Sequence, residues 1–260
     1  MARYQVVLAY DGTDFYGFQR QQRGTRERTV QGVTEAALRQ LGWQGRAILF
    51  AGRTDTGVHA SGQVIAFDLD WAHPLDALGA ALNAYLPLDV AVQSVQEANP
   101  DFHPRYDALA RCYRFRIFCR AARDPLRERY AWRVWPAVDP GRLQQAALAL
   151  VGEHDFAAFG TPPRAGGVTI RKVYRAGWRS DQDDLTFEII ANAFLYRMVR
   201  RLVRFQVAIG QAEIDVADVG DFLRSGSPAP PTGLAPAQGL TLVEVIYRRE
   251  QFDSLVIDSL

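Results

Sequence analysis

The chain has 260 residues, of which 48% are hydrophobic, 23% charged and 11% aromatic, and its formal net charge at pH 7 is +1. This composition excludes a disordered protein, and the length exceeds the roughly 100 to 150 residues of one ordinary domain. The longest apolar run, AALALV at 146–151, is far shorter than the roughly 20 residues of a membrane-spanning helix. We therefore expect a soluble protein of two domains, 1–105 and 106–260.

The hydrophobic periodicity predicts the same order of elements twice along the chain. In the first half, strands are expected at 3–11, 46–51, 63–70 and 90–98, and helices at 29–41 and 74–86. In the second half, strands are expected at 111–118, 168–178, 185–191 and 239–247, and helices at 139–151, 194–210 and, as a short insertion, 215–226. Each half is thus predicted to be a βαββαβ unit.

Such a unit folds into a largely antiparallel sheet with both helices on one face. We therefore predict an α+β protein in which two similar units join their sheets side by side, with the helices on one face and an active-site cleft between the halves. The helix at 29–41 is expected to bury Val30, Val33, Ala37, Leu38 and Leu41, with Thr29 capping its start.

Charge is distributed unevenly, with net values of −2 for 1–100, +6 for 101–200 and −3 for 201–260. Nine arginines against three acidic residues lie in 103–133, interleaved with aromatic side chains. Arginine clamps phosphate and stacks on bases, so this mixture is typical of an RNA-facing surface, with Arg111 and Arg114 as candidate phosphate ligands. A genome that prefers arginine would give the same composition, and the sequence leaves both explanations open.

Two glycine-rich loops contain the residues that decide the chemistry: YDGTDFYGFQRQ at 10–21 and GRTDTGVHASGQV at 52–64. Asp55 lies between two threonines, with glycines nearby that permit unusual backbone angles, so it is a candidate nucleophile or general base. An Asx turn capped by the neighbouring hydroxyls is the structural alternative. His59, His103 and His154 are interpreted as structural residues.

Several common sites are not expected from this sequence. The phosphate-binding, dinucleotide-binding and zinc-protease motifs do not occur, and the acidic residues are not paired in a way that suggests a metal. Cys112 and Cys119 have no CxxC pattern and are interpreted as reduced thiols. The start, MARYQVVLAYDG, shows no export signal, which favours a cytoplasmic protein. The loops at 160–168 and 225–238 have no predicted role.

Five blocks, in order and at similar separations, resemble the tRNA pseudouridine synthase A family: YDGTDFYGFQ, GRTDTGVHA, RCYRF, NAFLYRMVRRLV and APAQGLTLVEV. The resemblance runs from residue 4 to about 245, and GRTDTGVHA is its most specific block. It implies a homodimeric enzyme that isomerises uridine to pseudouridine at positions 38, 39 and 40 of the tRNA anticodon arm. It also implies that neither a metal nor an organic cofactor takes part.

The resemblance assigns roles residue by residue. Asp55 matches the catalytic aspartate, Tyr113 the tyrosine that stacks on the target base, and Arg200 the basic residue that pairs with the aspartate. Arg53 matches a basic neighbour suited to a phosphate, and Leu240 an apolar residue that packs near the uracil. The carboxylate adds to the ribose C1′, adds to uracil C6, or assists a glycal route, and the sequence does not choose among these.

Two rival functions remain to be weighed. Asp55 opens the triplet DTG of aspartic proteases, but that chemistry needs two aspartates that share a proton and this chain contains one such triplet. A non-catalytic tRNA-binding module would keep the arginine and aromatic surface without any need for Asp55. Replacing that side chain therefore distinguishes an enzyme from a binding module.

Overall fold

A computed structural model of the protein describes residues 1–21, 27–224, 226–230 and 232–257. These residues form ten strands, paired mostly antiparallel, and six α-helices, which confirms the α+β class. The chain divides into two compact units: unit 1 is Met1–Leu109 with Thr241–Tyr247, and unit 2 is Ala110–Leu240 with Arg248–Leu260. None of the described helices is both long and apolar enough to cross a membrane.

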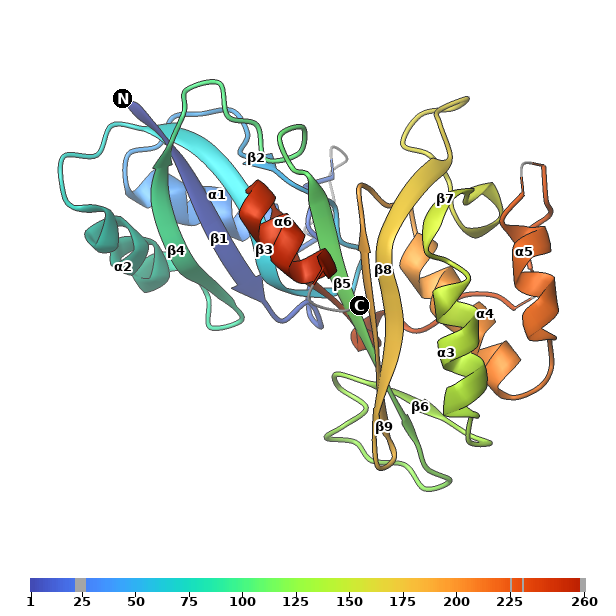
Figure 1. The fold of residues 1–260 in the computed structure, drawn as a ribbon. Coiled ribbons are helices and arrows are strands. Elements are labelled where there is room, and N and C mark those ends of the chain that lie inside the picture. The colour runs from blue at the N-terminus through green and yellow to red at the C-terminus, as the bar shows by residue number, and fades with distance from the viewer. Residues whose placement is uncertain (22–26, 225, 231, 258–260) are drawn as a thin grey trace. The chain divides into compact units, whose positions relative to one another are not determined.

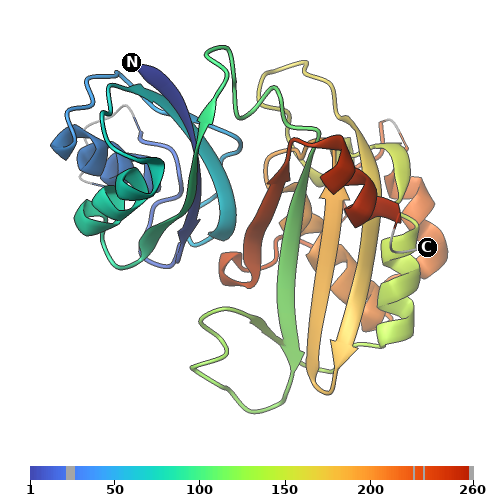
Figure 2. The same cartoon turned by 60° about the vertical axis from the view of Figure 1, so that its left-hand side comes forward.

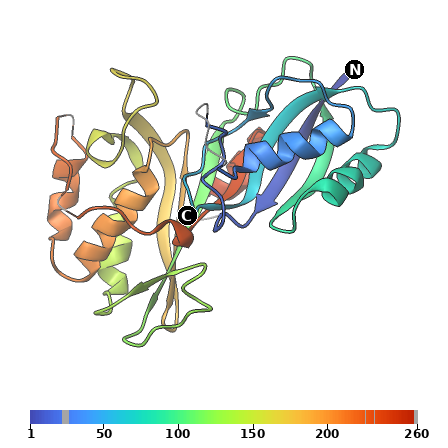
Figure 3. The same ribbon diagram turned by 180° about the vertical axis from the view of Figure 1, so that it is seen from behind.

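Unit 1 is a sheet with two helices on one face (Figures 1 and 3). Its strands lie in the order β4 (Val90–Ala98), β1 (Ala2–Tyr10), β3 (His59–Leu69) and β10 (Leu240–Ile246), and the short β2 (Leu49–Phe50) also pairs with β3. The pairs of β1 are antiparallel, whereas β10 runs parallel to β3 with Thr241 opposite His59. Because β10 pairs with β3, residues 241–247 belong to unit 1 and not to the second half in which the sequence placed them.

Strand β3 begins earlier than predicted. The sequence HASG looks like part of a loop, but His59–Leu69 is one strand, so the loop before it is shorter than the expected 52–64. Gly62 explains the difference, because a Cβ there would lie 2.1 Å from the carbonyl oxygen of Val243. The glycine therefore permits a close approach of two backbones and is not a turn residue.

Helices α1 (Val30–Gln40) and α2 (Leu75–Tyr85) lie on the same face of the unit 1 sheet (Figure 3). The predicted cap of α1 is confirmed, since Thr29 Oγ1 accepts a hydrogen bond from Gly32 N at 3.2 Å. The buried face was predicted in part. Val30, Ala37 and Leu38 are buried, but Val33 and Leu41 are half-buried, and the polar residues Gln31, Thr34 and Glu35 are buried instead.

Unit 2 is a second sheet with helices on both faces (Figure 2). Its antiparallel strands lie in the order β5 (Ala110–Cys119), β9 (Asp184–Ala191), β8 (Ile170–Asp181) and β7 (Gly152–Asp155), and β6 (Trp132–Val134) pairs with β5 in parallel. One face carries α3 (Pro140–Leu148) and α4 (Met198–Gly210), and the short α5 (Val219–Phe222) contacts α4 through Phe222 and Phe205. The opposite face carries α6 (Arg249–Ile257), which the sequence did not predict.

Helix α4 begins at Met198 and not at the predicted residue 194. Arg197 has φ 63° and ψ 8°, a left-handed conformation that cannot continue a right-handed helix. Residues 192–197 are therefore a connection, and Arg200 lies in the first turn of α4. The predicted insertion at 215–226 is a 3-10 turn, Val216–Asp218, followed by α5, and Ser225 lies outside the described residues.

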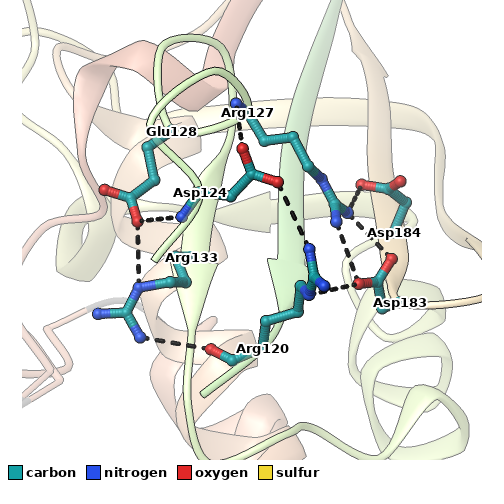
Figure 4. A network of polar contacts seen from close by, with 7 residues as sticks. All are labelled: Arg120, Asp124, Arg127, Glu128, Arg133, Asp183 and Asp184. Atoms are coloured by element: carbon teal, nitrogen blue, oxygen red, sulfur yellow. Dashed lines mark hydrogen bonds and ion pairs between the residues drawn. The ribbon is translucent and has the colours of Figure 1, made fainter. Parts of the chain in front are cut away.

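The connection 120–131, between β5 and β6, is held by a network of ion pairs (Figure 4). Arg127 donates to Asp183 at 3.0 Å and to Asp184 at 2.6 Å, and its guanidinium lies 4.2 Å from the centre of the Phe118 ring. Glu128 lies 3.2 Å from the Arg133 guanidinium. These pairs attach the connection to the turn between β8 and β9 and to β6.

Candidate active site

The Asp55 loop, residues 51–58, connects β2 to β3 and is held from below by two buried side chains. The hydroxyl of Tyr10 and Oγ1 of Thr54 share a hydrogen bond of 2.8 Å. Gln63, whose side chain is fully buried, donates from Nε2 to Gly52 O at 2.7 Å and accepts at Oε1 from Gly52 N at 3.3 Å. Both interactions fix the backbone immediately before Asp55.

The neighbouring loop, residues 10–21, holds the Asp55 loop from the side. Phe18 N donates to Thr54 O at 3.1 Å, and Gly57 N donates to Phe15 O at 3.3 Å. Gly17 has φ +86°, and a Cβ there would lie 2.8 Å from Thr54 O, so both its conformation and its surroundings require glycine. The backbone on either side of Asp55 is therefore bonded to a second loop.

The interactions around Tyr10 are between neutral groups. Burial raises the pKa of the Tyr10 phenol to about 12, so the hydroxyl stays protonated at neutral pH. His59 has the structural role predicted for it, because the ring is buried and Nδ1 lies 3.0 Å from Gly12 N and 3.1 Å from Asp11 Oδ1. Above this buried layer, Asp55 is half-buried and Arg53 is exposed, so both side chains are accessible to a substrate.

Tyr113 lies on β5 of unit 2, opposite Ile189, and its side chain is 9% exposed. The rings of Tyr113 and Phe194 meet edge to face, with 5.0 Å between the ring centres and 83° between the planes. Arg111, two residues earlier and so on the same face of the strand, donates to Asn192 O at 2.9 Å. Both residues contact the connection 192–197 that leads into α4.

Arg200 and Leu240 also lie in unit 2, Arg200 on α4 and Leu240 at the end of a segment that contacts both α4 and β5. Arg200 Nε donates to Ala235 O at 2.8 Å, and Ala235 N donates back to Arg200 O at 3.2 Å. Leu240 is buried and follows Gly239, where a Cβ would lie 2.6 Å from the ring of Phe115. This close packing fixes the position of Leu240 relative to β5.

Arg114 points to the other face of β5, away from Tyr113. It forms an ion pair of 2.9 Å with Glu188, whose second oxygen lies 3.8 Å from Arg175. The side chains border a hollow of about 1000 Å³, which is also lined by Arg116 and Arg179. Four arginines thus line one open region of unit 2.

The residues proposed from the sequence therefore fall into two groups, with Arg53 and Asp55 in unit 1 and Arg111, Tyr113, Arg114, Arg200 and Leu240 in unit 2. The supporting roles of Tyr10, Gln63 and Gly17 were not predicted from the sequence. A polar residue in an otherwise apolar strand, as Gln63 is in QVIAF, is the one signal that indicates such a role. In the described part of the chain, no group of three or more His, Cys, Asp or Glu side chains is placed to hold a metal ion.

The matching family model and the similar proteins below name the same kind of enzyme. The family described as tRNA pseudouridine synthase matches residues 6–107 and 146–248. The tRNA pseudouridine synthase A of Limosilactobacillus fermentum is 40% identical over 252 residues, which cover 95% of this chain and 96% of that protein. The protein of the same name from Chloroflexus aurantiacus is 42% identical over 93% of this chain and 87% of its own, and that from Brevibacillus brevis is 39% identical over 95% and 100%.

The chain belongs to the tRNA pseudouridine synthase family. It is accordingly an isomerase that acts on uridine in tRNA. Membership in this family of enzymes decides against both rivals, the aspartic protease and the tRNA-binding module without activity.

Proposed function

We propose that this enzyme converts uridine to pseudouridine at positions 38, 39 and 40 of the tRNA anticodon arm, with Asp55 as the catalytic carboxylate. The observation that carries the proposal is the environment of Asp55 within the GRTDTGVHA block. Its side chain is half-buried, while Tyr10, Gln63 and the loop 10–21 fix the backbone beside it. A carboxylate that is accessible but held in place is suited to attack on one defined atom.

The reaction sets what the site has to do. The bond from uracil N1 to ribose C1′ breaks, the base rotates, and a bond forms from C5 to C1′. The proton of C5 leaves to solvent, and N1 acquires a proton. Three routes are open to the carboxylate: addition to C1′, addition to C6, or assistance of a glycal intermediate. In each of them the nucleotide must first leave the base stack, at a free-energy cost of a few kcal/mol.

The other residues share the work of holding that nucleotide. Tyr113 stacks on the flipped uracil, with its ring braced by Phe194. Arg200 pairs with Asp55, since a charge partner keeps a partly desolvated carboxylate ionised. Leu240 packs against the uracil, and Arg53 binds a phosphate. These roles require residues of both units to act on the same nucleotide. The proposal therefore includes the cleft between two similar halves that the sequence predicts.

Binding of the rest of the tRNA is assigned to phosphate contacts. Arg111 and Arg114 are proposed as ligands of the RNA backbone, which allows recognition by shape at several adjacent positions. The arginine-lined hollow beside Arg114 supports this assignment. Function as a homodimer in the cytoplasm completes the proposal, and light scattering of the purified protein tests the oligomeric state.

Transcripts that contain uridine labelled with tritium at C5 test the proposed positions, because formation of the C5–C1′ bond releases the label. The experiment uses unmodified tRNA transcripts with uridine at 38, 39 or 40 alone, in the presence of a chelator. We expect release from each of these transcripts and none from a transcript with cytidine at all three positions. Release from the transcript without these uridines, or loss of activity caused by the chelator, contradicts the proposal.

A further inference from the structure

We infer that Glu35, a buried carboxylate of α1, is a positioning residue that holds the loop 10–21 and, through this loop, Asp55. The inference rests on the proposed catalytic role of Asp55. Glu35 was not singled out by the sequence, and its side chain is fully buried, so it cannot touch a tRNA. Its effect on the reaction has to pass through other residues.

The burial of this carboxylate is unusual and needs compensation, because an ionised group without partners is strongly unfavourable in a protein interior. Oε1 accepts hydrogen bonds from Gln31 Nε2 at 2.7 Å and from Ile48 N at 3.2 Å. Oε2 lies 2.9 Å from Nη1 of Arg20. Arg20 belongs to the loop 10–21, so the guanidinium closest to Glu35 comes from the loop that contacts Asp55.

Gln31 adds two further bonds between α1 and the same loop. Its Oε1 accepts from Arg20 N at 3.0 Å, and its backbone N donates to Phe18 O at 2.8 Å. Together with the ion pair of Glu35, these bonds attach the loop to the helix at Phe18 and at both the backbone and the side chain of Arg20. The buried polar residues Gln31 and Glu35 of α1 thus attach the loop 10–21 to the helix.

The last step of the connection runs from Phe18 to the Asp55 loop. The carbonyl of Phe18 accepts a hydrogen bond from α1, and the N–H of Phe18 donates to Thr54 O at 3.1 Å. Gly17 lies against the same carbonyl of Thr54. One residue therefore links the helix to the backbone beside Asp55. Loosening of the Arg20–Glu35 pair is expected to let this segment move, and small displacements of a reacting group reduce rates strongly.

Arg39 provides a matched control. Its guanidinium also approaches Glu35 Oε2, at 3.8 Å, and its side chain is 47% exposed, close to the 49% of Arg20. Arg39 lies on α1 itself, so it contributes charge near Glu35 without connecting the helix to the loop. The variants Arg20→Gln and Arg39→Gln each remove one positive charge from the surroundings of the Glu35 carboxylate. Only Arg20→Gln also removes the ion pair between α1 and the loop 10–21.

Single-turnover rates, tRNA dissociation constants and thermal unfolding of the full-length variants test the inference. We expect Arg20→Gln and Glu35→Gln each to lower the single-turnover rate about tenfold, with the dissociation constant unchanged, and the double variant to lose no more than either alone. Arg39→Gln should keep the rate within about twofold of wild type. If Glu35→Gln does not fold, Arg20→Gln carries the test.

Three outcomes would overturn the inference: equal effects of Arg20→Gln and Arg39→Gln, an unchanged rate in Arg20→Gln, or weaker tRNA binding with an unchanged rate, which would make Arg20 a substrate ligand. Asp55→Asn is measured in parallel. Activity in Asp55→Asn refutes the proposed function, whereas an inactive Asp55→Asn beside a fully active Arg20→Gln refutes the role of Glu35 alone.

Discussion

The Asp55 loop of unit 1 joins β2 to β3, and the connection 120–131 of unit 2 joins β5 to β6. Different kinds of interaction hold these two segments in place. The direct contacts of the buried side chains Tyr10 and Gln63 with the Asp55 loop are hydrogen bonds between neutral groups, and the Arg20–Glu35 ion pair acts on the neighbouring loop 10–21. In the connection 120–131, the contacts are ion pairs among partly exposed side chains, with Arg127 at the centre (Figure 4).

The difference follows from what each segment has to tolerate. Exposed ion pairs are weakened by salt and contribute little to stability, whereas buried hydrogen bonds are screened much less. A catalytic carboxylate needs a fixed position under all conditions, so neutral buried contacts suit it. Arg114, a proposed phosphate ligand, is itself held in an ion pair with Glu188, so this pair competes with phosphate and salt. We therefore expect rate and binding to respond to different substitutions.

Gly17→Ala should break the Asp55 loop most severely. The new Cβ would lie 2.8 Å from Thr54 O at a left-handed φ, so we expect a loss of about 1–3 kcal/mol in stability and a fall of about 100-fold in single-turnover rate. Gly42→Ala is the matched control, because Gly42 has the similar φ of +87° but nothing within 4 Å of the added Cβ. That variant should lose about 1 kcal/mol and keep its rate. Similar rates in the two variants would exclude a role for the contact with Thr54.

Tyr10→Phe should loosen the same loop more gently. It removes the hydrogen bond to Thr54 Oγ1, which is worth about 1 kcal/mol, and we expect the rate to fall several-fold. Tyr4→Phe removes a hydroxyl from another buried tyrosine of β1, far along the strand from the Asp55 loop, and should leave the rate unchanged. Chemical denaturation and single-turnover kinetics measure both effects, and an equal response of the two variants would mean that the hydroxyl of Tyr10 has no special role.

The double variant Arg114→Gln/Arg116→Gln addresses binding. Arg116 lines the same hollow as Arg114, so we expect both to contact phosphate. Loss of the two contacts should weaken all tRNAs alike and reduce the slope of log affinity against log salt by about one unit per contact. The bound complex should still react at the wild-type rate, because both side chains lie on the strand face opposite Tyr113. Arg123→Gln/Arg224→Gln removes the same charge from sites that are 74% and 73% exposed, and should change the slope less. An unchanged slope in the first variant places the RNA elsewhere.

The smallest effect is expected from Arg127→Gln, which opens the network in Figure 4. The hydrogen bond from Arg127 lowers the pKa of Asp183 below its ordinary value. A lowered pKa in the folded state means that this contribution to stability is present above the ordinary carboxylate pKa of about 4 and is lost as pH falls through the lowered value. The difference in melting temperature between wild type and Arg127→Gln should therefore be small at pH 7, shrink below pH 4, and shrink in high salt. A difference that is independent of salt would contradict an electrostatic origin.

Much of the fold could be predicted because most elements have a clear period. The strands at β1, β4, β5 and β9 and the helices α1 and α2 alternate or repeat in ways that a single sequence reveals. The boundaries of elements were predicted wrongly where the conformation depends on a contact with a segment far away in the sequence. Gly62 looks like a loop residue until the neighbouring strand is known, and the left-handed Arg197 that delays α4 has no signal in a sequence that is helical in composition. Pairing of β10 with β3 is likewise a long-range contact.

The site shows the same division. Asp55, Tyr113 and Arg200 were proposed from blocks that resemble a known family, and such blocks mark residues that face a substrate. Tyr10, Gln63 and Glu35 are buried and support the site without facing a substrate. The role of a buried polar residue can be assigned only when the structure shows its hydrogen-bond partner. Gln31 and Glu35 lie outside the apolar face that the periodicity predicted, and their burial depends on partners from the loop 10–21 and from Ile48 that bind their polar groups.

The central claim is that Asp55 carries out the isomerisation, and the most direct measurement is tritium release from C5-labelled tRNA under single-turnover conditions by Asp55→Asn. The substitution keeps the shape of the side chain and removes its charge, so we expect no detectable release while folding and tRNA affinity stay close to wild type. Asp14→Asn removes the same charge from an exposed position on the neighbouring loop and should remain active. Release by Asp55→Asn within about tenfold of the wild-type rate would contradict the account, because removal of a nucleophile lowers rates by far more.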